Sequence, residues 1–179
     1  MRQDLRIVVE GMDGAGKSSL INRLIYDFDN LAIVHNPEGP DRDFNRWWPE
    51  ELDRKKSSLV PIHDRFFFSE LVYGPVIRGK LSVGSVLLNN VVLFLRTTSL
   101  LVYARPHSDV LHQAVFSPER VDMAGVRENF QSLLELYDNV MMVEASWFKD
   151  RFIRYDWNSP ESYPAVYEKV KAYLDGKLP

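Results

Sequence analysis

The sequence contains no cysteine among its 179 residues. This absence excludes disulfide bonds, thiolate metal sites and a cysteine nucleophile, and it is typical of a reducing compartment. Long apolar runs are also missing. The longest, VVLFL, is far shorter than the roughly 20 residues that span a bilayer, and the first residues lack the apolar stretch of a secretory signal. We therefore expect a cytoplasmic protein that does not associate with membranes.

An excess of charge of one sign is absent as well. The chain carries 22 basic and 25 acidic residues, which gives a net charge of −3. We therefore expect no stable binding to nucleic acid, although a local basic pocket is compatible with this balance. Hydrophobic residues make up 45% and charged residues 26% of the chain, as in ordinary globular proteins. A single domain over 1–179 is expected from this length.

Short apolar runs alternate with segments whose apolar residues recur at helical spacing. The runs predict strands at 5–10, 31–35, 58–64, 100–104 and 151–156. The spaced segments predict helices at 18–28, 66–77, 83–95, 107–116 and 122–145, a charged, bent helix at 42–56, and a carboxyl-terminal helix that starts at Ser159 and Pro160. Strands that alternate with helices indicate an α/β fold with a mostly parallel sheet.

A glycine-rich stretch, GMDGAGKS, joins the first predicted strand to the first predicted helix. It matches the phosphate-binding pattern G-x-x-x-x-G-K-[ST], in the strand-to-helix context that the pattern requires. Glycine lets backbone N–H groups point at phosphate oxygens, while Lys17 would bind the β- and γ-phosphates and Ser18 would bind Mg²⁺. The sequence thus predicts a nucleoside triphosphate and Mg²⁺ as cofactors. The predicted nucleotide-binding residues are Gly11, Asp13, Gly14, Ala15, Gly16, Lys17, Ser18 and Ser19.

A second motif, DRFFFSELVYG, follows the third predicted strand. In open α/β sheets, ligands approach the carboxyl ends of the strands, beside such a phosphate loop. Asp64 offers a carboxylate to Mg²⁺ or its waters, and Arg65 offers a planar cation to a phosphoryl group. We predict catalytic roles for Lys17, Asp64 and Arg65, and metal binding by Ser18 and Asp64. A structural ion pair between Asp64 and Arg65 is the alternative.

Together, EGMDGAGKSS and DRFFFSELVYG resemble the motifs of the thymidylate kinase family of P-loop nucleoside monophosphate kinases, in a form similar to that of bacterial viruses. The resemblance implies the P-loop NTPase fold, with five mostly parallel strands in the order 2-3-1-4-5 and a short lid at about 105–121. It implies transfer of the γ-phosphoryl group of ATP to dTMP or a related, possibly modified, deoxynucleotide. Because the family is commonly dimeric, it also implies a homodimer.

The resemblance assigns roles around the acceptor. Asp13 would bind the 3′-hydroxyl of the sugar, and Arg65 would lie between the donor and acceptor phosphates. Tyr73 would lie under the sugar near its 2′ position, where bulk favours deoxyribose; core packing is its alternative role. Ser69 and Glu70 would lie along the acceptor base.

In this family an arginine from the lid or the phosphate loop stabilises the transferring group. The loop of this chain carries Gly14 and Ala15 at that place, so the lid must supply the arginine. Arg120 is the first candidate as a catalytic residue, with Arg105 and Arg127 as alternatives.

The chain departs from the family after the second strand, where the family has an arginine that holds the acceptor phosphate. Here the stretch is HNPEGPDRDF, with Glu38 near that place and Arg42 or Arg46 as substitutes. This departure keeps a second hypothesis open: a deoxynucleoside kinase whose acceptor is a 5′-hydroxyl and whose general base is Glu38. A nucleotide-gated binding module is a third and less favoured hypothesis.

Overall fold

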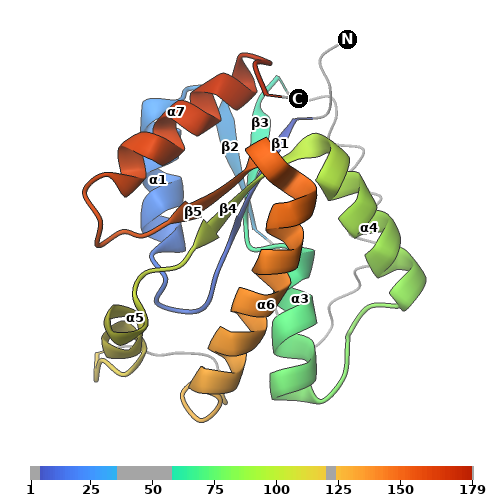
Figure 1. The fold of residues 1–179 in the computed structure, drawn as a ribbon, viewed down its shortest axis with the longest axis vertical. Helices are drawn as coiled ribbons and strands as arrows, with labels where there is room; N and C mark the ends of the chain where they lie inside the picture. The colour runs from blue at the N-terminus through green and yellow to red at the C-terminus, as the bar shows by residue number, and fades with distance from the viewer. Residues whose placement is uncertain (1–4, 36–57, 120–123, 179) are drawn as a thin grey trace.

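The computed structural model describes residues 5–35, 58–119 and 124–178 (Figure 1). Five of the sequence predictions lie outside these ranges: the helix at 42–56 and the roles of Glu38, Arg42, Arg46 and Arg120. Everything below concerns the described residues.

A five-stranded parallel sheet forms the centre of the protein, in the order β2-β3-β1-β4-β5. This confirms the predicted fold class and strand order. The strands are β1 (Arg6–Glu10), β2 (Leu31–His35), β3 (Val60–Asp64), β4 (Ser99–Ala104) and β5 (Phe152–Tyr155). Every residue of β1 and β4 is buried, because layers of helices cover both faces of the sheet. Pro61 of β3 has no N–H to donate to a neighbouring strand. It is tolerated because the pairing of β3 with β1 starts only at the next residue, Ile62, opposite Ile7.

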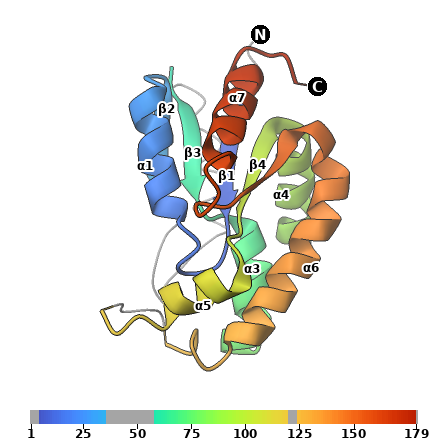
Figure 2. The same cartoon turned by 60° about the vertical axis from the view of Figure 1, so that its left-hand side comes forward.

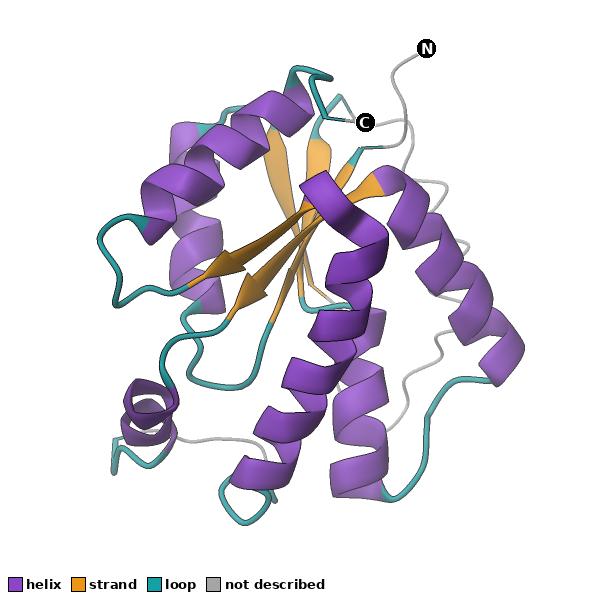
Figure 3. Cartoon of the chain, viewed as in Figure 1, coloured by secondary structure: helices purple, strands orange, loops and turns teal. Residues whose placement is uncertain are grey.

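The helices form two layers, which Figure 3 shows on either side of the strands. One face is covered by α1 (Lys17–Asp27) and α7 (Ser162–Leu174), and the other by α3 (Phe67–Tyr73), α4 (Ser85–Thr98) and α6 (Phe130–Phe148). The π-helix η2 (Gly74–Arg78) continues α3, and the 3₁₀ turn η3 (Lys149–Arg151) leads into β5. A short helix, α5 (Ser108–Val115), lies beyond the carboxyl ends of the strands (Figure 2). No helix of the described ranges is both long and apolar enough to cross a membrane.

Two helix starts differ from the predictions by more than two residues. The helix expected from residue 122 begins at Phe130: Gly125 has a φ of 87°, which a helix cannot contain, and residues 124–129 form turns. The predicted start at Ser159 and Pro160 is wrong: α7 begins at Ser162. Ser159 instead forms a turn in which its amide donates to the Asp156 carbonyl and its carbonyl accepts from the Ser162 amide.

Candidate active site

The phosphate loop connects β1 to α1 and lines a pocket of about 620 Å³. Gly11 has a φ of 149°, and a Cβ at this position would collide with the carbonyl of Ala104 on β4. Gly16 has a φ of 83°, in the left-handed region that favours glycine. The N-cap residue of α1 is Gly16, which has no side chain to cap the helix, and such a helix amino terminus is suited to bind an anion. The loop therefore has the backbone that phosphate binding requires.

Lys17, the first residue of α1, is buried at the floor of this loop. Its ammonium group donates a hydrogen bond to the carbonyl of Met12, at 2.9 Å. Burial, together with the nearby charge of Arg65, lowers the pKa of Lys17 to about 7. A bound phosphate would supply the negative charge that favours the protonated lysine.

Ser18 and Asp64 bring two oxygen atoms together in the pocket. The Ser18 hydroxyl donates to Oδ2 of Asp64 at 3.2 Å, although the two residues come from α1 and β3. Oxygen ligands suit Mg²⁺, which keeps several of its waters and takes further oxygens from phosphates. Among the described residues there is no cluster of three or more metal-binding side chains. The pair therefore fits the predicted metal site.

Asp13, Arg65 and Tyr73 form a closed cluster at one end of the pocket. Nη2 of Arg65 donates to Oδ1 of Asp13 at 2.7 Å, and the Tyr73 hydroxyl donates to Oδ2 of the same carboxylate at 2.7 Å. The Tyr73 hydroxyl also accepts from the Asp13 amide and from Arg65, each at 3.2 Å. Burial alone would raise the pKa of Asp13, but the charges of Arg65 and Lys17 and these hydrogen bonds hold it below its usual range.

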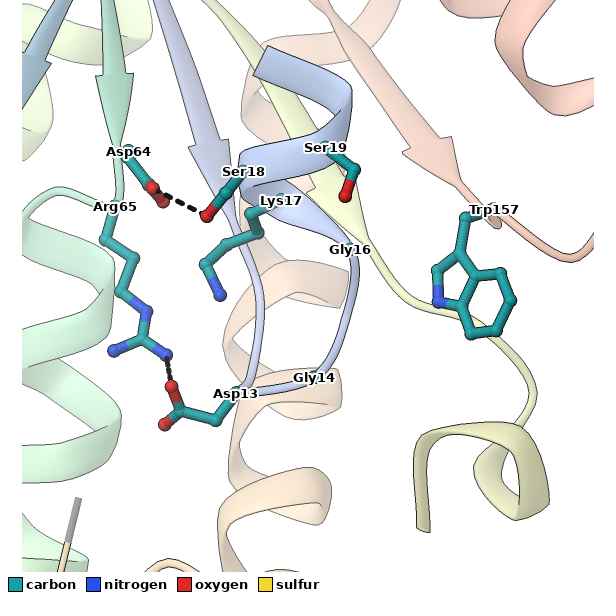
Figure 4. Close-up of a pocket in the computed structure, with 9 residues that line it drawn as sticks. All are labelled: Asp13, Gly14, Gly16, Lys17, Ser18, Ser19, Asp64, Arg65 and Trp157. Carbon is teal, nitrogen blue, oxygen red and sulfur yellow. Dashed lines mark hydrogen bonds and ion pairs between the residues drawn. The ribbon is translucent and has the colours of Figure 1, made fainter. Parts of the chain in front are cut away.

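The guanidinium of Arg65 keeps unused hydrogen-bonding capacity in this cluster. Its Nε is buried and has no hydrogen-bond partner among the described residues, while 22% of the side chain, which lines the pocket, remains exposed. An unsatisfied donor in a buried site is unfavourable unless a ligand completes it. Figure 4 shows Arg65 and Asp13 on the β3 side of the loop, next to Lys17.

Ser69 and Glu70, predicted to lie along the acceptor base, are both bonded within the protein and are not among the residues that line this pocket. Ser69 donates to Oε2 of Glu10 at 2.6 Å. Glu70 is 3% exposed and accepts from Arg78 and from the amide of Ser82, each at 2.5 Å. Tyr73 is also buried, and its hydroxyl is directed at Asp13 rather than at open space.

The two alternative lid arginines are bonded to protein atoms. Arg105 donates to both carboxylate oxygens of Asp138, at 2.8 and 2.9 Å, and Arg127 donates to the carbonyl of Ser117 at 3.0 Å. The part of the predicted lid that the structure describes contains α5.

Sequence reasoning missed Trp157. Its indole lies in the loop between β5 and α7 and lines the pocket at the end opposite Arg65 (Figure 4). A Cβ on Gly16 would lie 2.6 Å from Cδ1 of Trp157, so the ring rests against the phosphate loop itself. Trp157 as a whole is 44% exposed. The position of Trp157 in the sequence was a signal for this role, because it directly follows the fifth predicted strand. In a parallel sheet that strand ends on the same side as the strand before the phosphate loop.

Comparisons with known proteins were made in sequence and in structure. No protein-family model matches the chain, and no curated protein matches it in sequence. Among solved structures, YorR from Bacillus subtilis in complex with phosphorylated GDP has 19% identity and a TM-score of 0.71, covering 96% of this chain and 98% of its own. Deoxyadenosine kinase from M. mycoides with bound dATP has 15% identity and a TM-score of 0.57, covering 93% and 98%.

Polyphosphate kinase 2 from Arthrobacter aurescens TC1 has 12% identity and a TM-score of 0.63, covering 98% of this chain and 69% of its own. At such identities a structural likeness shows the fold alone. The chain has the fold of P-loop kinases.

Proposed function

We propose that the protein is an ATP- and Mg²⁺-dependent deoxynucleoside monophosphate kinase that acts on dTMP or a related deoxynucleotide. One observation supports the proposal: the cation Arg65 lines the same pocket as the phosphate loop and Lys17. An oxygen of the acceptor phosphate attacks the γ-phosphorus, the bond to the β–γ bridging oxygen breaks, and ADP leaves.

The surroundings of the acceptor favour a phosphate over a free hydroxyl. A hydroxyl acceptor needs a general base, whereas a phosphate acceptor needs cations that screen its charge. The carboxylates in the described lining of the pocket are Asp13 and Asp64. Asp13 is a weak base because its pKa is lowered and both its oxygens are bonded, and Asp64 is assigned to Mg²⁺. This leaves the cation Arg65 as the group suited to the acceptor.

The chemistry that these residues perform is alignment and charge screening rather than covalent catalysis. Lys17 would bind the donor phosphates, and Ser18 and Asp64 would hold Mg²⁺ with its waters, which supplies further positive charge when bound. Arg65 would bind the phosphoryl oxygens between donor and acceptor. Trp157 would stack on the base of ATP, since an exposed indole offers a flat surface at the donor end of the pocket.

A deoxynucleoside kinase is the second candidate, and the likeness to deoxyadenosine kinase favours it. Its predicted general base, Glu38, belongs to the part of the chain that the structure does not describe.

ADP release from Mg-ATP distinguishes the candidates, measured with deoxynucleosides, their 5′-monophosphates and the ribose counterparts. We expect turnover with monophosphates and little with nucleosides. Turnover with nucleosides alone would transfer the assignment to the second candidate. No turnover with any acceptor, despite binding of ATP, would indicate the nucleotide-gated binding module.

A further inference from the structure

The backbone of Arg65 is strained. Its φ of 64° lies in the left-handed region, which is unfavourable for a residue other than glycine. Hydrogen bonds on both sides hold it there. The Arg65 amide donates to the carbonyl of Val9 at 2.9 Å, and the next amide, of Phe66, donates to Oε1 of Glu10 at 2.7 Å. The conformation that places Arg65 therefore depends on the last two residues of β1.

Glu10 also caps α3, although it belongs to a different element. No side chain of the Phe66 N-cap residue caps this helix. Instead, the Glu10 carboxylate accepts from the amides of Phe66 and Ser69, at 2.7 and 3.2 Å, and from the Ser69 hydroxyl at 2.6 Å. A negative charge at a helix amino terminus is favourable, and amides there need acceptors. Glu10 is fully buried, so no water substitutes for it.

The same residue joins the two motifs of the active site. Glu10 ends β1 and directly precedes Gly11 of the phosphate loop, while its side chain holds the turn that follows β3. The charged and titratable groups that face it are Arg65, Lys17 of α1 and Tyr137 of α6, whose hydroxyl donates to Oε2 at 3.4 Å. Any change in the Glu10 carboxylate is thus transmitted to the turn that carries Arg65.

We propose that Glu10 is a positioning residue whose carboxylate keeps the turn at Arg65 in its left-handed conformation, so that the guanidinium is directed at the phosphate loop. The inference rests on the proposed function, because it takes Arg65 as the group that binds the transferring phosphoryl. Burial raises the pKa of Glu10 to about 6. The carboxylate is therefore ionised at neutral pH and protonates as the pH falls through this value.

A double-mutant cycle tests the proposal. Glu10→Met keeps the length of the side chain and removes both acceptor oxygens, and Glu10→Gln keeps one. We expect Glu10→Met to lower kcat on the order of 10- to 100-fold, the range for a misplaced catalytic group, and Glu10→Gln to lower it less and to abolish any fall in kcat near pH 6. In an Arg65→Ala background, both changes should have no further effect on kcat, because Glu10 acts through Arg65.

Glu144→Gln is the matched control. Glu144 is another buried carboxylate bonded to an arginine, Arg96, so it reports a general effect of removing buried charge. It should change the melting temperature and leave kcat unaltered. If the fold-losses of kcat from the Glu10 and Arg65 substitutions multiply in the double variant, the proposal is overturned. If Glu10→Met does not fold, Ser69→Ala, which removes the 2.6 Å bond to Glu10, takes its place in the cycle.

A crystal structure of the Glu10→Gln or Ser69→Ala variant separates this inference from the proposed function. Its outcome does not depend on which acceptor the enzyme uses. We expect the bond between Arg65 and Asp13 to lengthen or the φ of Arg65 to leave the left-handed region. An unmoved Arg65 would refute the positioning role, whereas a wild-type protein without phosphotransfer would refute the proposed function alone.

Discussion

At the scale of single residues, the site depends on groups whose charge is set by burial. Lys17 is buried with a pKa of about 7, so it is largely neutral in the free protein above this pH. Bound phosphates favour its charged form, and their binding should therefore raise its pKa. Above pH 7 the protein must take up a proton when it binds ATP, and its affinity should fall as the pH rises.

Isothermal titration calorimetry of ATP binding at pH 8.5, in buffers of different ionisation enthalpy, measures this proton uptake. We expect a buffer-dependent enthalpy that corresponds to a fraction of a proton, and none in Lys17→Met. An enthalpy that is equal in all buffers for the wild type would contradict the assignment of Lys17 to the donor phosphates.

Trp157 provides a second test at this scale. If its indole stacks on the donor base, Trp157→Ala should weaken ATP binding about tenfold, which corresponds to about 1.4 kcal/mol, and leave the KM of the acceptor unchanged. Trp147 on α6 is the matched control, since it is also exposed but contacts Arg96 instead of the loop. Equal effects of the two substitutions on ATP affinity would argue against stacking.

At the scale of elements, α4 and α6 are joined by a buried ion pair away from the pocket. Arg96 donates to both oxygens of Glu144, at 2.8 and 2.6 Å, and Glu144 is 4% exposed. Arg96 lies just before β4 begins, near the amino end of that strand, whereas the phosphate loop follows the carboxyl end of β1. The pair therefore belongs to the packing of the helix layer and not to the site.

Glu144→Ala should lower the free energy of unfolding by about 3 kcal/mol, because it leaves Arg96, whose side chain is only 18% exposed, without its carboxylate partner. Urea denaturation measures this loss, and kcat of the folded variant should match the wild type. Replacing both residues, in Arg96→Met with Glu144→Leu, should recover much of the stability. A large loss of kcat in Glu144→Ala would show that the helix layer and the site are coupled.

At the scale of the whole molecule, the sheet and the phosphate loop could be predicted because they follow from local pattern. Apolar runs fit strands buried on both faces, and Gly16 and Lys17 stand at fixed spacing before a helix. The start of α7 could not be predicted in this way, since a turn involving Asp156 takes the place of the expected Ser159 cap.

The details of the site depended on contacts between distant segments. Ser69 was expected beside the acceptor base, but its hydroxyl is bonded to Glu10, 59 residues away. Trp157 reaches the loop because β5 runs parallel to β1 in the same sheet, so both strands end on the same side. Such contacts depend on how the fold brings distant segments together rather than on local pattern. Lys17 and Arg65, which belong to the two motifs, line one pocket.

The most direct test of the proposed kinase compares dTMP with thymidine, which differ only in the acceptor phosphate, in wild type and in Arg65→Ala. The ratio of their kcat/KM values measures how far the site requires that phosphate. We predict a ratio of at least about 100 for the wild type, because thymidine lacks the phosphate to which Arg65 would donate charged hydrogen bonds, and a ratio much closer to one for Arg65→Ala. A wild-type ratio at or below one would contradict the assignment of a monophosphate acceptor.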